Sequence, residues 1–321
     1  MAEEPIIRVE QLEKRFQIRS GSIGKKGLIH AVNGVTLEIG RGETLGLVGE
    51  SGCGKSTLGR TILKVYEPDG GRIFCDGTDI TDFSRRQMRP WRKRMQMIFQ
   101  DPYASLNPRF TVGELIAEPM QIYETCTPQE QTERVQELLR TVGLKPDHIR
   151  RYPHEFSGGQ RQRIGIARAL ALEPEFIVCD EPISALDVSI QAQIVVLLER
   201  IQDEKGISYL FIAHDLTMVR HISHRIGVMY MGELVEIGQA DEVCEHPVHP
   251  YTRLLMSAVP IPDPVRARQQ TRILPQGEVP SPIDLPPGCP FSPRCPYATE
   301  QCRNAVPPLR EKNGRQVACF L

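Results

Sequence analysis

Long apolar runs are missing from this sequence of 321 residues. The longest compact one, residues 194–198, falls far below the roughly 18 residues that a membrane-spanning helix needs. The first residues are acidic and lack the basic and apolar regions of a signal peptide. We therefore expect a cytoplasmic protein, which reaches any membrane by binding to other proteins.

A charge excess of either sign is also missing. Lys and Arg total 39 and Asp and Glu total 40, which gives a formal net charge of -1. We therefore predict no nucleic-acid partner, because such proteins usually carry a basic surface. The apolar fraction of 40% and the charged fraction of 25% are ordinary for a globular protein. The length allows one large domain with an appendage or two modest domains.

Cysteine, by contrast, is plentiful and unevenly placed. There are nine cysteines, and four of them fall within the last 33 residues: Cys289, Cys295, Cys302 and Cys319. A reducing cytoplasm does not favour structural disulfides. The spacing lacks the close pairs of a zinc ribbon, so it permits zinc, an iron–sulfur cluster or no metal. Four thiolates at one metal centre would order this proline-rich segment.

Strand-like apolar runs alternate with helical patterns over most of the chain. Residues 44–48, 176–179 and 208–212 are typical of buried strands, and a helix is expected over about 56–64 after a glycine-rich turn. This alternation predicts a mainly parallel sheet covered by helices, which is an α/β fold.

Two regions differ from that alternation. Residues 6–16 and 32–38 predict a small antiparallel β-subdomain beside the core. Between about 101 and 168 the patterns are helical, and Thr127 begins a capping box with Glu130. We interpret this stretch as a helical subdomain inserted into the α/β core.

The composition changes again after Pro260. Proline becomes frequent and long periodic segments disappear, so we expect an irregular extension that has no packed core unless a staple holds it. The predicted domains are therefore residues 1–260 and a cysteine-rich C-terminal region, 261–321.

A phosphate-binding loop is the first functional signal. Nine residues match G-x-x-x-x-G-K-[ST]: Gly49, Glu50, Ser51, Gly52, Cys53, Gly54, Lys55, Ser56 and Thr57. Glycines let backbone N–H groups surround phosphate oxygens, and the following helix directs its positive end at the same anion. We expect Lys55 to reach the β- and γ-phosphates and Ser56 to bind Mg²⁺. The alternative is a structural glycine turn, and Cys53 is interpreted as a tolerated small residue.

A buried strand that ends in two acids supplies the second half of such a site. It runs over 176–179 and is followed by Asp180 and Glu181. Asp180 is expected to hold Mg²⁺ through water, and Glu181 to polarise the attacking water as a general base. Taken alone, the pattern fits equally a strand that ends in solvated acids.

One motif ahead of that strand resembles the signature of ABC-type ATPases, which share a P-loop NTPase (RecA-like) core. Phe156 takes the place where Leu is commoner, and the motif continues with Ser157, Gly158, Gly159 and Gln160. The resemblance implies that this helix start faces the γ-phosphate of ATP held by a partner subunit.

Further residues follow the order of the same family. Gln100 resembles the glutamine that contacts Mg²⁺ and water, and residues 184–187 resemble the segment that crosses the dimer interface. His214 resembles the switch histidine, and Phe16 the aromatic that stacks on adenine. Phe16 alone fits equally a core residue at a strand end. The resemblance covers about residues 6–260 and implies ATP and Mg²⁺ as cofactors, with Glu181, Lys55, His214 and Gln100 as the catalytic set.

Three stretches narrow the resemblance to the ATPases of dipeptide and oligopeptide importers: residues 100–108, 181–189 and 246–252. The similarity is to the second of the two unlike ATPases of such systems. It implies a heterodimer with another ATPase subunit, two membrane permease subunits, an extracytoplasmic solute-binding protein, and a location on the cytoplasmic face of the membrane.

Alternatives remain open at this point. Nickel and glutathione importers share much of the pattern, and a soluble ABC ATPase or an iron–sulfur sensor with a regulatory ATPase are rivals from other classes. Some family members with a similar tail hold a four-iron four-sulfur (4Fe-4S) cluster. By that resemblance, Cys289, Cys295, Cys302 and Cys319 are candidate ligands, with zinc and free thiols as the alternatives.

Overall fold

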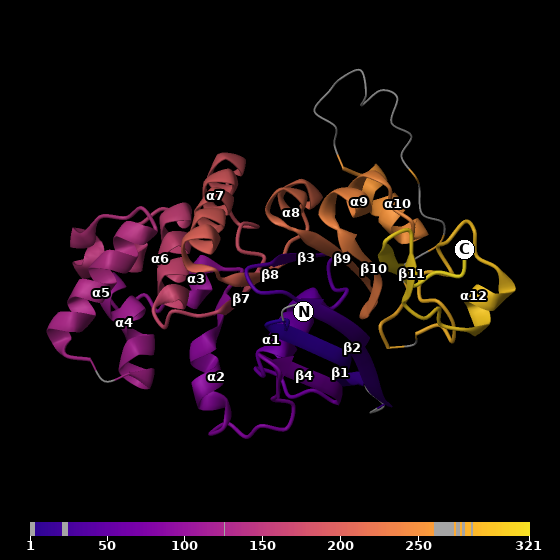
Figure 1. Ribbon diagram of the computed structural model, residues 1–321, viewed down its shortest axis with the longest axis horizontal. Coiled ribbons are helices and arrows are strands. Elements are labelled where there is room, and N and C mark those ends of the chain that lie inside the picture. Colours follow the sequence, from indigo (N-terminus) through magenta and orange to yellow (C-terminus); the bar gives the residue numbers. More distant parts are fainter. Residues whose placement is uncertain are drawn as a thin grey trace, which may run out of the picture. The chain divides into compact units, whose positions relative to one another are not determined.

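The computed structural model describes residues 4–20, 25–124, 126–259, 273, 277, 280–283 and 285–321. Its described residues fall into two compact units. Unit 1 draws on Met1–Ile7, Glu38–Thr44 and Phe74–Ala213, and unit 2 on Arg8–Leu37, Leu45–Ile73 and His214–Leu321. Each unit therefore contains segments that are far apart in the sequence, as the colours in Figure 1 show.

Unit 1 contains a parallel sheet built from three buried strands. Strand β7 (Phe176–Asp180) lies between β6 (Met95–Ile98) and β8 (Ser208–Ile212), and it is parallel to both. Helix α7 (Val188–Lys205) connects β7 to β8. This β–α–β succession agrees with the predicted α/β fold.

Helices follow β6 along the chain. They are α3 (Pro102–Ser105), α4 (Val112–Tyr123), α5 (Pro128–Thr141) and α6 (Gly158–Leu170), with short 3₁₀ turns η1 (Pro146–Arg150) and η2 (Pro153–Glu155) between α5 and α6. Helices α4, α5 and α6 pack against one another (Figure 1). The predicted capping box is confirmed, because Thr127 accepts the N–H of Glu130 and the Glu130 carboxylate accepts the N–H of Thr127. Helix α2 (Met88–Arg94) precedes β6.

Unit 2 holds a second set of paired strands. Strand β3 (Thr44–Val48) is parallel to β9 (Arg225–Tyr230), and β9 is antiparallel to β10 (Glu233–Gln239). The helices α1 (Lys55–Ile62), α8 (Leu216–Ile222), α9 (Ala240–Glu245) and α10 (Pro250–Ser257) belong to the same unit.

A separate sheet has the strand order β2–β1–β4–β5. Strands β1 (Ile7–Ser20) and β2 (Lys25–Ile39) are longer than the stretches predicted from the sequence. Strand β1 ends at Ser20, beyond the predicted range, and β2 begins at Lys25, ahead of it. Strands β4 (Gly70–Cys75) and β5 (Thr78–Asp79) complete the sheet.

The C-terminal segment, residues 285–321, differs from the prediction of an irregular extension without a packed core. It contains α12 (Glu300–Asn304) and a hairpin of β11 (Arg310–Lys312) and β12 (Arg315–Val317). Strand β12 pairs with β10, with Val317 opposite Glu236. Most of residues 285–321 lie outside helices and strands, as predicted, but the expected lack of packing was wrong. A strand of three residues shows no periodicity, and its partner lies about 80 residues away in the sequence.

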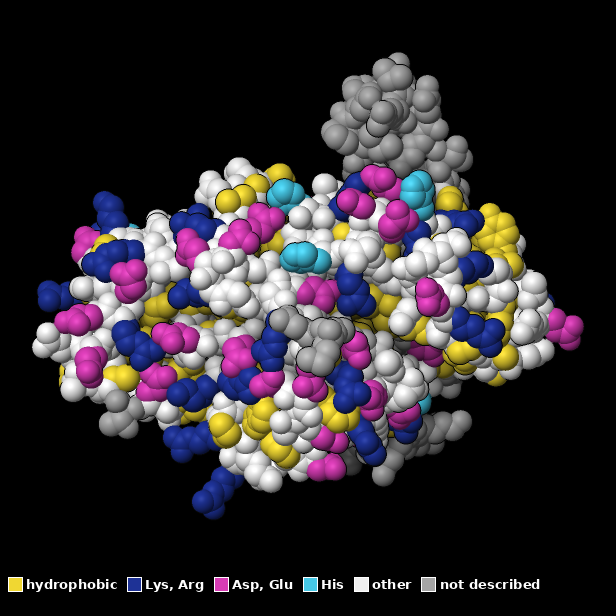
Figure 2. Space-filling view, in the orientation of Figure 1, with side chains coloured by type: hydrophobic (Ala, Val, Ile, Leu, Met, Phe, Trp, Pro, Cys, Tyr) yellow, Lys and Arg dark blue, Asp and Glu magenta, His cyan; other side chains and the backbone are white. Residues whose placement is uncertain are grey.

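Two general properties of the surface complete the description. On the face shown in Figure 2, basic and acidic side chains are interspersed over both units. Among the described residues, no helix is long and apolar enough to cross a membrane.

Candidate functional site

The phosphate-binding loop lies in unit 2, between the end of β3 and the start of α1. Two of its glycines are required by close backbone contacts. A Cβ at Gly54, whose φ is +105°, would lie 1.9 Å from the carbonyl oxygen of Ala31. A Cβ at Gly49, whose φ is +154°, would lie 2.2 Å from the carbonyl oxygen of Met229. The loop therefore has a shape that only glycine allows at these two positions.

Lys55 is the first residue of α1 and is only 4% exposed. Its ammonium group donates hydrogen bonds to the carbonyl oxygens of Gly49, at 2.8 Å, and Glu50, at 3.1 Å. The positive charge is thus held against the loop, beside partly buried Ser56 and Thr57 in the first turn of the helix. This combination of lysine, hydroxyls and helix N-terminus is suited to a polyphosphate.

Cys53 also lies inside the loop and is buried. Its Sγ atom is 3.7 Å from the Nζ atom of Lys55. Burial raises the pKa of the Cys53 thiol, and the nearby ammonium group of Lys55 opposes that effect without cancelling it. A buried thiol with a raised pKa is a poor nucleophile, which agrees with the interpretation of Cys53 as a tolerated small residue.

Two residues far along the chain hold the same loop: Arg294, which lies outside every motif, and Tyr251, which belongs to the stretch 246–252 but was assigned no part in the site. The Arg294 guanidinium makes hydrogen bonds of 3.0–3.2 Å to the Glu50 carboxylate. The N–H of Glu50 donates to the hydroxyl of Tyr251 at 2.9 Å. Both partners lie more than 200 residues downstream of the loop, so no local pattern identifies them.

In unit 1, β7 ends in the two predicted acids. Asp180 is its last residue and is fully buried. Glu181 has a φ of +46°, a strained value for a residue with a side chain, and its N–H donates to the carbonyl oxygen of Ile212 at 2.9 Å. Gln100 donates from Nε2 to Oε2 of Glu181 at 2.7 Å. The structure thus brings together two predicted site residues that are 81 positions apart.

The signature residues form the start of α6, also in unit 1. Ser157 and Gln160 cap this helix reciprocally, with hydrogen bonds of 3.1 Å and 3.4 Å. Gly159 lies close to another helix, because a Cβ there would be 2.5 Å from the Cγ2 atom of Ile190. Gly158 precedes it with ordinary space around its Cα. The N-terminus of a 13-residue helix carries partial positive charge, which favours an anion.

Phe16 and His214 are the remaining predicted residues, and both lie in unit 2. Phe16 is partly exposed and its ring meets Tyr66 edge-on, with centroids 5.4 Å apart. A partly exposed ring of this kind leaves area for a stacking partner. His214 is exposed and directly precedes Asp215, which caps α8.

Oxygen atoms dominate the side chains predicted to hold Mg²⁺. Ser56 offers a hydroxyl, Gln100 an amide oxygen and Asp180 a buried carboxylate. Such oxygen donors fit Mg²⁺, which is a hard cation.

The cysteine-rich segment does not fit a metal centre in the same way. The N–H of Cys289 donates to the carbonyl oxygen of Cys302, and burial raises the pKa of the Cys289 thiol to about 11. The described residues, which include all four cysteines, contain no group of three or more His, Cys, Asp or Glu side chains that could hold a metal ion. The prediction of an iron–sulfur cluster therefore has no support in this structure.

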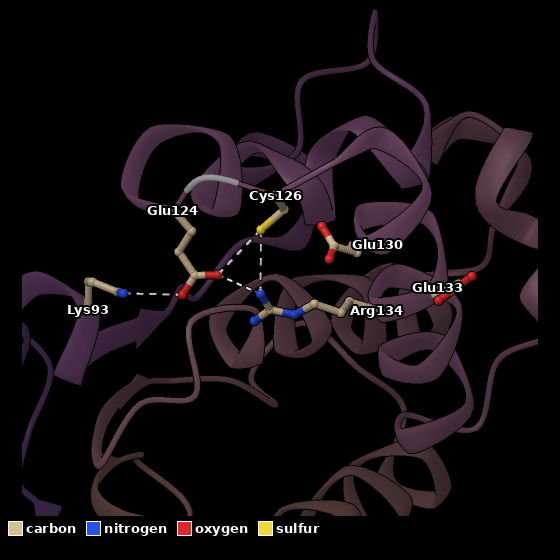
Figure 3. A pocket seen from close by; sticks show the side chains of 6 residues that line it. All are labelled: Lys93, Glu124, Cys126, Glu130, Glu133 and Arg134. Atoms are coloured by element: carbon tan, nitrogen blue, oxygen red, sulfur yellow. Dashed lines mark hydrogen bonds and ion pairs between the residues drawn. The ribbon is translucent and has the colours of Figure 1, made fainter.

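A polar pocket of about 580 Å³ lies in unit 1, and none of its lining residues is a predicted site residue. It is lined by Lys93, Glu124, Cys126, Glu130, Glu133 and Arg134 (Figure 3). Glu124 forms ion pairs with Lys93 at 3.2 Å and with Arg134 at 2.5 Å. Because these charges neutralise one another and no phosphate-binding element lines the pocket, we assign it no part in nucleotide binding.

Two protein-family models match separate parts of the chain. Residues 32–184 match the family model described as ABC transporter. Residues 235–302 match the model for the oligopeptide/dipeptide transporter C-terminal region. The second match includes Arg294 and Tyr251, the two downstream residues that contact the phosphate-binding loop.

Similar proteins extend over nearly the whole chain. YkfD of Bacillus subtilis (strain 168) is 55% identical over 319 residues, which are 99% of this chain and 95% of the relative. The oligopeptide transport ATP-binding protein AppF of the same organism is 50% identical over 322 residues, which cover 99% and 98% of the two chains.

Solved structures show the same fold at lower identity. The cbiO1 protein of Clostridium perfringens, part of the ABC transporter complex cbiONQ, is 30% identical with a TM-score of 0.66 over 76% of this chain and 92% of that chain. A dimeric ATP-binding cassette in a post-hydrolysis state with ADP and Pi is 28% identical with a TM-score of 0.66, over 73% and 98% of the two chains.

Proposed function

Because the chain belongs to the ATP-binding proteins of ABC transporters that carry the oligopeptide/dipeptide C-terminal region, we propose that it hydrolyses ATP to power the import of short peptides. Two observations carry this proposal. Both family models match the chain, and the chain is 50% identical to a named oligopeptide transport protein over nearly its full length.

Each part of the site has a role in the proposed reaction. The glycine-shaped loop binds the phosphates, and Lys55 moves its ammonium group from the loop carbonyls to the β- and γ-phosphates. Ser56, Gln100 and, through water, Asp180 would hold Mg²⁺, which would neutralise charge on the phosphates. Phe16 stacks on the adenine ring, and His214 contacts the γ-phosphate.

The chemical step is the attack of water on the γ-phosphorus atom. Glu181 accepts a hydrogen bond from that water and orients it, and Gln100 keeps the Glu181 carboxylate in place until water and substrate arrive. The P–O bond to the β-phosphate breaks, and ADP and phosphate leave. Lys55 stabilises the negative charge that develops on the phosphate oxygens.

The site is completed by a second subunit in this proposal. The start of α6, with Ser157, Gly158, Gly159 and Gln160, faces the γ-phosphate bound by a partner ATPase, and the partner's corresponding helix does the same here. We propose a heterodimer on the cytoplasmic face of the membrane, docked on two permease subunits that receive cargo from an extracytoplasmic binding protein. No step depends on a metal at the four C-terminal cysteines.

The test is a transport assay with the assembled complex in proteoliposomes. The expected result is ATP-dependent uptake of labelled di- to pentapeptides, with ATP hydrolysis stimulated by the loaded binding protein. Nickel ions and glutathione serve as competing cargoes, because importers for them share the sequence pattern. Uptake of nickel or glutathione without uptake of peptide would contradict the proposed cargo and leave the ATPase assignment intact.

A further inference from the structure

Glu50 is held at three of its polar groups. Its carboxylate accepts hydrogen bonds from Arg294, its N–H donates to Tyr251, and its carbonyl oxygen accepts from Lys55 at 3.1 Å. Lys55 is the phosphate-binding lysine of the loop, whereas Arg294 and Tyr251 belong to the C-terminal region. One residue therefore connects the phosphate-binding loop to a part of the chain that has no other place in the proposed reaction.

The Arg294 side chain is built into its position. It is 6% exposed, whereas the Glu50 side chain is 31% exposed. Its guanidinium carbon lies 5.9 Å from the ring centroids of Tyr230 and Phe291, and one of its nitrogens lies 3.4 Å from the Tyr230 hydroxyl. A guanidinium fixed by aromatic rings gives up little additional freedom when it binds a carboxylate. The contact is thus more ordered than an ordinary surface ion pair.

The electrostatics explain why such a contact matters to this loop. A carboxylate in a loop that binds a polyanion repels the ligand unless a cation neutralises it. Lys55 cannot serve both purposes, because its ammonium group contacts the loop carbonyls here and is required by the phosphates in the reaction. Arg294 is the cation that pairs with this carboxylate in the described structure.

We propose that Arg294 is a positioning residue for ATP binding: it neutralises Glu50 and fixes the phosphate-binding loop in its binding shape. This inference rests on the proposed ATP site. It gives the C-terminal region a direct part in the affinity for nucleotide. Glu181, which orients the attacking water, lies in unit 1, and Lys55 keeps its hydrogen bond to the carbonyl oxygen of Gly49 without Arg294, so the main effect falls on binding and KM rather than on kcat.

The test measures the affinity of the purified full-length chain for a fluorescent ATP analogue with Mg²⁺, and KM and kcat in the assembled transporter. Arg294→Gln leaves the Glu50 carboxylate unpaired, and we expect about five- to twenty-fold weaker binding. KM should rise by a similar factor, with kcat within about twofold. The loss should shrink as salt is added, because it arises from charge repulsion.

The decisive variant combines two changes. Glu50→Gln removes the repelling carboxylate, so adding it to Arg294→Gln should restore most of the lost affinity. Arg294→Lys keeps the charge and should bind ATP more tightly than Arg294→Gln. Arg303→Gln, an exposed position on α12 in the same segment, is the matched control and should bind ATP like the wild type.

Different failures have different meanings. If the wild-type chain does not bind ATP, the proposed function fails. If the wild type binds ATP and Arg294→Gln binds it equally well, the role of Arg294 is overturned. A double variant as weak as Arg294→Gln, or weaker, would show that Arg294 serves only to dock the C-terminal segment. Should Arg294→Gln alone not fold, the double variant is compared with the wild type, and ATP binding more than about fivefold weaker in the double variant would contradict the proposal.

Discussion

The phosphate-binding loop and the C-terminal segment, residues 285–321, are both ordered, but they are held by contacts of different range. The loop takes its backbone shape from its own glycines and from the helix that begins at Lys55, and Arg294 and Tyr251 add contacts to Glu50 from the C-terminal region. The C-terminal segment has only short elements, and its order comes from distant partners: β12 lies on β10, and Phe291 packs against Tyr230 and Tyr251. These contacts account for the order of a segment that has few regular elements of its own.

A substitution in the loop should have the largest effect. Gly54→Ala introduces a Cβ 1.9 Å from the carbonyl oxygen of Ala31, and no rotamer change can relieve a clash with backbone. We expect ATP hydrolysis to fall by about a hundredfold or more, which corresponds to about 3 kcal/mol of lost binding and positioning. The measurement is the steady-state rate in the assembled transporter.

Gly52→Ala is the matched comparison for that variant. Gly52 has a φ of +80° in the same loop, but nothing lies within 4 Å of an added Cβ. Its loss should be restricted to backbone strain of about 1–2 kcal/mol, a smaller effect than that of Gly54→Ala. Equal losses in the two variants would mean that the close contact with Ala31 is not what fixes the loop.

A core substitution in the C-terminal segment should act on stability instead. Phe291 is 1% exposed, and its ring centroid is 5.3 Å from that of Tyr230 and 5.4 Å from that of Tyr251. Phe291→Ala should lower the free energy of unfolding by about 3–4 kcal/mol, measured by denaturant titration. Tyr297→Ala, at a position that is 54% exposed, should change it by less than about 0.5 kcal/mol. Similar values for the two variants would show that the segment is not packed as described.

Acid should destabilise the region in which His249 and Tyr251 lie against Phe291, and this effect should be smaller than that of the substitutions above. Burial lowers the pKa of His249 to about 3, and its Nδ1 atom accepts the N–H of Tyr251 at the start of α10. The unfolded chain therefore binds the proton first as the pH falls below about 6.5, so the stability contributed by neutral His249 is lost between that value and about 3. At pH 5 the loss should be about 2 kcal/mol.

The variant His249→Asn isolates that effect, because asparagine can accept the same N–H but does not titrate. Two charged groups lie near His249: Glu236 accepts the N–H of His249 at 2.8 Å and lies 3.5 Å from Arg315. Both are present in the wild type and in the variant, so they do not distinguish the two proteins. Unfolding free energies of wild type and variant should converge as the pH falls from 7.5 to 5. Parallel pH profiles would contradict the assignment to His249.

These contacts also show what the sequence can and cannot predict. The strand β3, the glycine-rich turn, the acid-ended β7 and the capping box at Thr127 are local patterns, and each lies where it was predicted. The candidate ATP site and the family resemblance could therefore be predicted from neighbouring residues alone. Gln100 and Glu181 could be named by family order, but their contact is a product of the parallel pairing of β6 with β7.

The C-terminal segment was missed because its partners are remote. Arg294 carries no motif that points to Glu50, which lies 244 positions earlier. One local signal did exist: Asn313 and Gly314 both have positive φ values between β11 and β12, as in a tight hairpin turn. That Asn-Gly pair predicts the hairpin, although it cannot predict that the hairpin joins β10.

The central claim is that this chain hydrolyses ATP with Glu181 as the base, and one comparison tests it most directly. Wild type and Glu181→Gln would be assembled with their partner subunits, and ATP binding, ATP hydrolysis and peptide uptake measured on the same preparations. We predict that Glu181→Gln binds ATP with nearly unchanged affinity, while hydrolysis falls by about a hundredfold or more and uptake is lost. Hydrolysis within about tenfold of the wild type would contradict the account, because the water would then be activated by another residue.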